Sequence, residues 1–194
     1  MLQQPLFNSS YPSFMNYGGI GFDIAREMVH AFDELGRPFD SAGLPRDWWN
    51  NATVKQYDAV KECVSSFYAK QNITADGETF KANADRTVVE DVADVVGLCC
   101  AAGAYDKNGD KIGDELVKQA FEGLNSKQLF FVAFAQSQCY KYDREYLPVV
   151  LDTSAISPAA IRVNGAVAQS SDFAEAFSCP SGSAMNPPNK CKTW

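Results

Sequence analysis

Arg26, Glu27 and His30 occupy the positions at which a metallopeptidase helix carries its chemistry. In the H-E-x-x-H pattern, two histidines on one face of a helix bind Zn²⁺, and the glutamate between them acts as general base. Glu27 and His30 stand where this pattern needs them, but Arg26 takes the place of the first histidine. His30 is the only histidine in the chain, so no other imidazole can replace it. The pattern therefore indicates a metallopeptidase scaffold whose metal centre has been dismantled.

A second pair of polar residues lies roughly sixty residues further on, at Glu90 and Asp94. A spacing of four places both carboxylates on the same face of a helix. By itself this spacing is typical of an exposed acidic face. In gluzincin zinc peptidases, however, such a pair supplies the third zinc ligand and a carboxylate that orients a ligating histidine. Together with the 26–30 segment it predicts one composite site.

The elements that must position these residues are expected to be mostly helices, because apolar residues recur at helical spacing. After Pro148 the composition of Ser, Ala and Gly predicts an irregular chain apart from one short helix. Segment 72–83 is expected to be irregular or briefly extended. The helix at 46–70 is expected to begin with Asp47 as its N-cap. The predicted helices cover 20–34, 46–70, 87–105, 126–142 and 171–177.

The composition indicates a globular protein of one domain and argues against nucleic acid binding and a membrane span. The 194 residues fit one domain, 1–194, and 46% hydrophobic and 12% aromatic residues are enough to build a core. With 17 Lys and Arg against 24 Asp and Glu, the net charge of -7 disfavours nucleic acid as a partner. No apolar stretch is long enough to span a bilayer. The first ten residues lack the basic start and apolar run of a signal peptide.

Glycosylation sequons and cysteines point to an oxidising, extracellular environment. Asn-x-Ser/Thr sequons occur at Asn8, Asn51 and Asn72, which are the candidate sites of glycosylation. Any single sequon can arise by chance, and the six cysteines could also be reduced, buried thiols. The combination nevertheless favours an extracellular protein, or the ectodomain of a membrane protein.

A series of short motifs, in order along nearly the whole chain, resembles the C-terminal part of the neprilysin and endothelin-converting-enzyme family of zinc metallopeptidases. The motifs are NYGGIG at 16–21, FD at 32–33, GR at 36–37, WW at 48–49, KQLFF at 127–131, FAQ at 134–136, FAEAF at 173–177 and CKTW at 191–194. The resemblance implies a mainly α fold, an incomplete C-terminal lobe of the gluzincin (thermolysin-like) type. It also implies that the N-terminal part of the family architecture is absent here, and that this missing lobe is needed for a complete fold.

Five residues stand at functional positions of that family. The resemblance implies that Glu27 is the general base, that His30 and Glu90 are the second and third zinc ligands, and that Asp94 orients the first ligand. Arg162 stands where the family binds a substrate carbonyl group. The implied cofactor is Zn²⁺ and the implied partners are peptides.

Three positions depart from the family. Arg26 replaces the first zinc ligand, Ile156 replaces a histidine that stabilises the tetrahedral intermediate, and Ser154 stands where Asp is expected. A guanidinium group has no lone pair to donate. Its charge about 4 Å from a divalent ion costs on the order of 8 kcal/mol at an effective dielectric near 20. The loss of a donor at Ile156 is worth about 3–4 kcal/mol where such donors have been tested. Zinc is therefore expected to bind weakly or not at all, and peptidase activity to be negligible.

The cysteines also match the family pattern only in part. The family pattern implies a disulfide between Cys63 and Cys191. Cys139 and Cys179 match positions that in the family bond to the N-terminal region, so they are either free or paired otherwise. The adjacent Cys99 and Cys100 resemble core thiols, or one buried and one free thiol.

Without zinc, Glu90 and Asp94 would need another positive charge, because unpaired carboxylates are costly to desolvate. Arg26 can supply it through a bidentate bond to one of them, or it can point into solvent while the site relaxes. Three classes of function stay open. The chain is an inactive module that binds peptides, a weakly active peptidase that uses His30, Glu90 and a non-family ligand such as Asp94, or a structural interaction domain.

Overall fold

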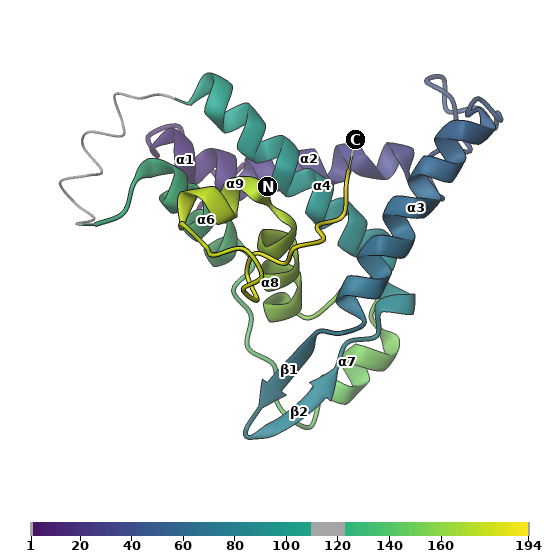
Figure 1. Ribbon diagram of the computed structural model, residues 1–194. Helices are drawn as coiled ribbons and strands as arrows, with labels where there is room; N and C mark the ends of the chain where they lie inside the picture. Colours follow the sequence, from purple (N-terminus) through teal and green to yellow (C-terminus); the bar gives the residue numbers. More distant parts are fainter. Residues whose placement is uncertain (1, 110–122, 194) are drawn as a thin grey trace.

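The computed structural model describes residues 2–109 and 123–193, and helices dominate these ranges (Figure 1). This confirms the mainly α fold class. The helical elements are α1 (Ser13–Asn16), the π-helical segment η1 (Tyr17–Gly21), α2 (Phe22–Val29), the 3-10 turn η2 (His30–Phe32), α3 (Asn51–Tyr68), α4 (Ala84–Asn108), α6 (Ser126–Ser137), α7 (Leu147–Thr153), α8 (Ala159–Gln169) and α9 (Ser171–Ala176). None of the helices in the described ranges is both long and apolar enough to cross a membrane.

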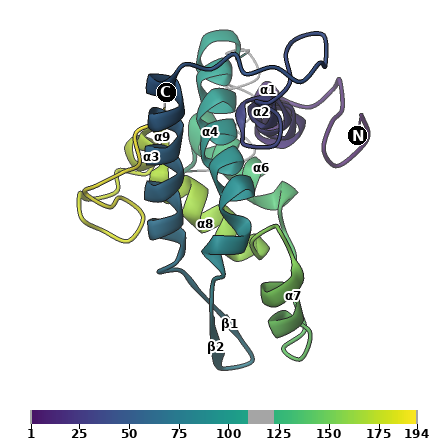
Figure 2. The same cartoon turned by 90° about the vertical axis from the view of Figure 1, so that its right-hand side faces the viewer.

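Helix α4 is the central element of the fold. It packs against α2, α3 and α8, and Figure 2 shows it between α3 and α2. Its apolar residues, among them Val92, Ala93, Val96 and Leu98, are buried. The helix predicted at 87–105 is present and extends further at both ends. Because α4 also carries Glu90 and Asp94, the candidate site is built on a largely buried helix.

The helix predicted at 20–34 belongs to a longer helical run. α1, η1, α2 and η2 follow one another without a break from Ser13 to Phe32. Ile20 is buried as its apolar spacing indicates, but Ile24, Met28 and Phe32 are exposed. The apolar stripe of this helix is therefore only partly covered by the described residues.

The predicted start of α3 was wrong. The helix begins at Asn51 rather than at 46, and its N-cap is Asn50, not Asp47. The side chain of Asn50 accepts a hydrogen bond from the backbone N–H of Thr53 at 2.9 Å. Such a bond satisfies one of the free amides at a helix start, so the better placed of the two capping residues sets the boundary.

Segment 72–83 forms a β-hairpin. Strands β1 (Asn72–Ala75) and β2 (Glu78–Lys81) pair antiparallel, with Asn72 opposite Lys81. The connecting residues Asp76 and Gly77 both have positive φ, which is the backbone that an Asp-Gly hairpin turn requires. The hairpin and α7 project together from the body of the lobe (Figure 1).

The prediction of an irregular chain after Pro148 was also wrong, because α7 and α8 are helical there. The small residues of α8 serve close packing: a Cβ atom on Gly165 would collide with the ring of Tyr68 on α3. Small residues therefore let α8 approach α3 and bring Arg162 to the centre of the lobe. The helix predicted at 126–142 is α6, and it ends earlier, at Ser137.

A disulfide joins Cys63 on α3 to Cys191 in the C-terminal segment, the pairing that the resemblance implies. Cys139 is an exposed free thiol and Cys179 a partly buried one. Cys99 and Cys100 are both free and exposed on α4. They are therefore not the core thiols that the sequence suggested.

Candidate functional site

The site forms where α2 crosses α4. At the crossing point Gly97 lies against Arg26, and a Cβ atom on Gly97 would stand 2.8 Å from the Cα atom of Arg26. Real Cβ atoms do not approach other atoms so closely, so glycine is what allows the two helices to meet here. Asp94 and Glu90 lie about one and two helical turns, respectively, before Gly97 on α4. The crossing thus brings the side chain of Arg26 to both carboxylates.

Arg26 contacts three carboxylates from two helices. Its Nε donates to Asp94 Oδ1 at 3.1 Å, Nη2 contacts Glu90 Oε2, and Nη1 contacts Glu27 Oε1. Only 13% of its side chain is exposed, so the alternative in which it points into solvent is wrong. The expected ion pair is present, although Arg26 shares its donors among three acids instead of binding one of them in bidentate fashion.

Asp94 is held by a second arginine. Arg162 on α8 donates through Nε and Nη2 to the two oxygens of Asp94, each at 2.7 Å, and Asp94 is almost completely buried. Burial lowers the pKa of Arg162, but the hydrogen bonds and the charge of Asp94 outweigh this effect and leave that pKa raised. Asp94 therefore serves as the shared counter-charge of Arg26 and Arg162.

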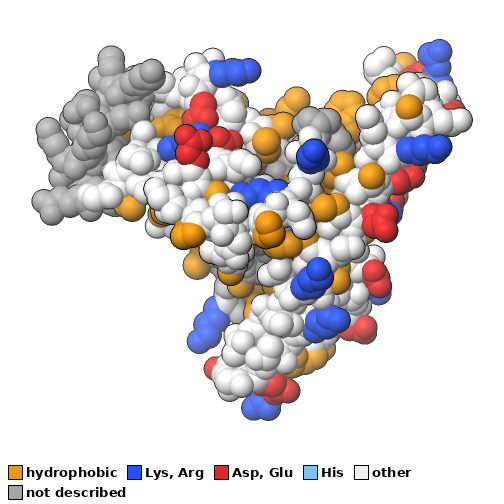
Figure 3. All heavy atoms as spheres, viewed as in Figure 1, with side chains coloured by type: hydrophobic (Ala, Val, Ile, Leu, Met, Phe, Trp, Pro, Cys, Tyr) orange, Lys and Arg blue, Asp and Glu red, His pale blue; other side chains and the backbone are white. Residues whose placement is uncertain are grey.

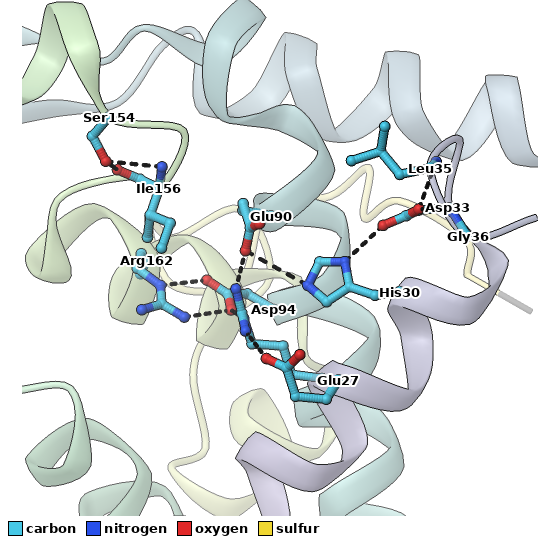
Figure 4. A network of polar contacts seen from close by, with 11 residues as sticks. Glu27, His30, Asp33, Leu35, Gly36, Glu90, Asp94, Ser154, Ile156 and Arg162 are labelled. Atoms are coloured by element: carbon cyan, nitrogen blue, oxygen red, sulfur yellow. Dashed lines mark hydrogen bonds and ion pairs between the residues drawn. The ribbon is translucent and has the colours of Figure 1, made fainter.

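His30 is oriented by a residue to which the sequence analysis gave no role. Its Nδ1 lies 2.6 Å from Asp33 Oδ2, and the other oxygen of Asp33 accepts the backbone N–H groups of Leu35 and Gly36 at 2.8 Å each. Asp33 is buried. The ring then presents Nε2 towards Glu90, 3.6 Å from its Oε2 (Figure 4). The signal in the sequence was an acidic residue three positions after the histidine.

Ile156 and Ser154 lie on a loop beside the cluster, and Figure 4 shows Ile156 on the same side as Arg162. The hydroxyl of Ser154 accepts the N–H of Ile156 at 3.0 Å and donates to its carbonyl at 2.8 Å. The side chain of Ser154 therefore stabilises the conformation of its own loop. The side chain of Ile156 is partly exposed and has no group that can donate a hydrogen bond.

Two further acids near the cluster have perturbed pKa values. Burial raises the pKa of Asp23, against the opposing charges of Arg162 and Arg26. Burial also raises the pKa of Asp91 to about 7, although hydrogen bonds from Thr87 and Ser157 act against it. The hydroxyl of Thr87 donates to Asp91 at 2.7 Å, and that of Ser157 donates to Thr87 at 3.0 Å. This chain of bonds links α4 to the loop that carries Ile156.

These residues do not fit a tightly held zinc ion. Zinc sites in proteins offer at least three N, O or S donors arranged around the metal. Of the three positions expected from the sequence, only His30 and Glu90 carry donors, and Arg26 contacts Glu90 where a metal would. Over the described ranges no group of three or more His, Cys, Asp and Glu side chains has the geometry of a metal site. The donor set and the guanidinium group both argue against the metal.

The candidate glycosylation sites differ in exposure. Asn51, at the first position of α3, and Asn72, on β1, are both exposed. Asn8 is half-buried, and its side-chain oxygen accepts the N–H of Ser10 at 2.8 Å. Asn51 and Asn72 therefore remain the more accessible acceptors.

Comparison with known proteins identifies the family of this chain. The family model of peptidase family M13 matches residues 1–193. Neprilysin-1 of Caenorhabditis elegans is 39% identical over 195 residues, and endothelin-converting enzyme 1 of Homo sapiens is 39% identical over 194 residues. Each match covers 100% of this chain but only 26% and 24% of the relative, so the chain spans about a quarter of their length.

Solved structures show the same likeness. A zinc metalloprotease of Mycobacterium tuberculosis, ZMP1 in its open state, superposes with a TM-score of 0.83 at 25% identity, over 100% of this chain and 30% of that one. A Haemonchus galactose-containing glycoprotein complex superposes with a TM-score of 0.85 at 28% identity, over 100% of this chain and 32% of that one. Sequence and structure lead to the same conclusion: this chain belongs to peptidase family M13.

Proposed function

We propose that this chain is a catalytically inactive lobe of the M13 metallopeptidase type, in which an arginine ion pair replaces the metal. The observation that carries the proposal is the guanidinium of Arg26 among Glu27, Glu90 and Asp94. One permanent positive charge compensates carboxylates that would otherwise stand unpaired, and a positive charge at that point repels a divalent cation.

The same contacts disable the implied general base. Glu27 Oε1 is engaged by the guanidinium of Arg26 and is therefore not free to accept a proton from a water molecule. Ile156 provides no donor for a developing oxyanion. Activation of a nucleophile and stabilisation of negative charge are thus both weakened, by different residues. This combination supports inactivity more strongly than the loss of one metal ligand alone.

A weakly active zinc peptidase is the second candidate, and the contacts of Asp94 disfavour it. A non-family ligand such as Asp94 would have to turn a lone pair towards the metal. Its two oxygens already accept three hydrogen bonds from Arg26 and Arg162, and it is buried. Releasing it would leave two arginines without their shared counter-charge.

Residual peptide binding is part of the proposal. Asp94 accepts one hydrogen bond from Nε and one from Nη2 of Arg162, so the N–H groups of Nη1 and the second N–H of Nη2 are the donors that a peptide carbonyl could use. The disulfide, the exposed sequons and the family relatives support an extracellular or ectodomain location. The family also supports a further lobe that completes the cleft.

Zinc content and peptide cleavage test inactivity. The wild type, Arg26→His and the double variant Arg26→His/Ile156→His are compared, with the exposed Arg86→His on α4 as a matched control. We expect zinc to bind only after Arg26→His, because a histidine adds a donor and removes the charge. Stoichiometric, tightly held zinc together with cleavage in the wild type would refute the proposal.

Peptide binding is tested by titration of the wild type and Arg162→Ala with a family substrate peptide, followed by calorimetry. We expect binding by the wild type that Arg162→Ala weakens. If neither protein binds the peptide, the third class, a purely structural interaction domain, is the better description. Circular dichroism of Arg162→Ala checks that the loss is not unfolding, since Arg162 also pairs with Asp94.

A further inference from the structure

Asp23 lies beside the ion-pair cluster, by which we mean Arg26, Arg162 and the acids that they contact. Its carboxyl group makes no hydrogen bond and no ion pair within residues 2–109 and 123–193. The acids around it are all partnered, either by one of the two arginines or by His30: Glu27, Asp33, Glu90 and Asp94. Asp23 is nevertheless partly buried, and this burial raises its pKa. A carboxyl group taken out of water without a partner destabilises the fold, and none of its described contacts compensates for that.

Helical spacing places Asp23 on the face of α2 that carries the cluster. It precedes Arg26 by three positions and Glu27 by four, which puts the three side chains next to one another on the helix. The charges of Arg162 and Arg26 act to lower its pKa, and those of Asp94 and Glu27 act to raise it. Asp23 therefore faces both arginines, although within the described ranges it is bonded to neither.

A capping role does not explain this acid. An acidic side chain in the first turn of a helix is favourable where the backbone N–H groups are free. However, α2 continues the helical run that begins at Ser13, and Gly21, just before α2, already has a helical φ of -62° and ψ of -41°. The helix thus has no free start at Asp23.

Arg162 has unused donors close to this acid. Asp94 accepts one hydrogen bond from Nε and one from Nη2, each at 2.7 Å, and lies directly beside Arg162 (Figure 4). The two N–H groups of Nη1 and one of Nη2 are left over. The side chain of Arg162 is 15% exposed, so part of it meets solvent. Arg162 and Asp23 together offer hydrogen-bond donors and a negative charge to one ligand.

The site as a whole has an excess of negative charge. Around its two arginines lie five acids: Asp23, Glu27, Asp33, Glu90 and Asp94. Only 13% and 15% of the side chains of Arg26 and Arg162 are exposed, against 59% of that of Glu27. A ligand that arrives from solvent therefore meets carboxylates first. The net charge of -7 on the chain also attracts cations.

The outer side of α3 shows no such excess on the face that Figure 3 draws. Acidic and basic side chains are mixed along this helix (Figure 3). One of the basic residues, Lys61, is paired with Glu34. Charges of both signs offset one another, so this side of α3 attracts a cationic peptide less than the site does.

We propose that Asp23 makes the site select peptides that carry a primary ammonium group beside the carbonyl group that Arg162 binds. The ammonium group is that of a lysine side chain or of a free N-terminus. This rests on the proposed residual peptide binding and adds to it the class of peptide. The peptide carbonyl accepts a hydrogen bond from Arg162, and the ammonium group donates a charge-assisted one to Asp23. Because Asp94 compensates the charge of Arg162, that arginine does not exclude the cation.

Calorimetry with three alanine pentapeptides, all amidated at the C-terminus, tests the proposal. The first is acetylated and has a central lysine, the second is acetylated and has a central norleucine, and the third has the norleucine and a free N-terminus. We expect the wild type to bind a cationic peptide about tenfold more tightly than the neutral second one, as a hydrogen bond to a charged group allows. The first and third peptides tell the two sources of ammonium apart. Asp23→Asn should reduce the preference to about twofold or less, and Asp23→Glu should restore part of it.

Asp58→Asn is the matched control, because it removes the same charge at an exposed position of α3 and should keep the preference. Circular dichroism verifies that each variant is folded. Equal affinity of the wild type for all three peptides, or a preference that survives Asp23→Asn, overturns this proposal but leaves peptide binding by Arg162 intact. If Asp23→Asn tightens the binding of all three peptides alike, Asp23 blocks Arg162 and the proposal is wrong. If none of the peptides binds, residual peptide binding fails as well, whereas zinc content tests the proposed inactivity separately.

Discussion

Replacing Arg26 by alanine is the most direct perturbation of the ion-pair cluster. Breaking a buried ion pair by removing one partner typically costs about 3–5 kcal/mol. Here Arg162 still compensates Asp94, and Glu90 and Glu27 retain some access to solvent, since 22% and 59% of their side chains are exposed. Arg26→Ala should therefore lower the free energy of unfolding by about 2–3 kcal/mol, at or below the lower end of that range. At this chain length that corresponds to a decrease in Tm of about 5–10 °C.

Urea unfolding followed by circular dichroism measures this loss. Arg86→Ala, at an exposed position of α4, is the control and should change the free energy of unfolding by less than about 0.5 kcal/mol. Adding Glu90→Gln to Arg26→Ala closes a double-mutant cycle, and a coupling energy of about 1–2 kcal/mol is expected if the two side chains interact as the structure shows.

Arg26→Lys should recover only part of the stability, because an ammonium group cannot present three donors in a planar fork. If Arg26→Ala is as stable as the wild type, or if the double-mutant cycle shows no coupling energy, the view that the arginine replaces the metal as a structural charge is refuted. It would mean that the contacts of Arg26 form without stabilising the fold.

Three further predictions follow from buried groups. The pKa of Asp91 is raised from 3.8 to about 7, so this group favours folding below pH 4 and its contribution is lost as the pH rises through 7. Asp91→Asn should flatten the fall in unfolding free energy between pH 4 and 8, and an unchanged slope in urea titrations would contradict this. Asp33→Ala should destabilise the protein by about 1–2 kcal/mol, measured by thermal unfolding, because the backbone N–H groups of Leu35 and Gly36 lose their acceptor; an unchanged stability would contradict this role of Asp33. Cys63→Ser/Cys191→Ser opens a loop of 128 residues and should cost about 4–5 kcal/mol in the chain-entropy model. Equal stability of this variant and the wild type would show that the disulfide does not form in solution.

The sequence by itself determined which side chains near the candidate site can donate a lone pair to a metal. An arginine at the first ligand position cannot donate a lone pair in any fold, and a chain with one histidine cannot supply another imidazole. The predicted helices of α2, α3, α4, α6 and α9 are present because apolar periodicity is a local property, although their ends moved where a better cap was available, as at Asn50. The composition after Pro148 did not predict α8, because Ala, Gly and Ser are also common in irregular segments. In α8 these small residues allow close packing against Tyr68.

Only the tertiary structure decided how the charges are compensated. Arg26 lies 64 and 68 residues from Glu90 and Asp94, and Arg162 lies 68 residues from Asp94 on the other side. No local pattern shows that two arginines share one buried aspartate, or that Asp33 orients His30. The close crossing of α2 and α4 at Gly97 and the packing of α8 set these partners, because an ion pair needs atoms within a few ångströms and the spacing of residues along the chain does not determine distances between helices.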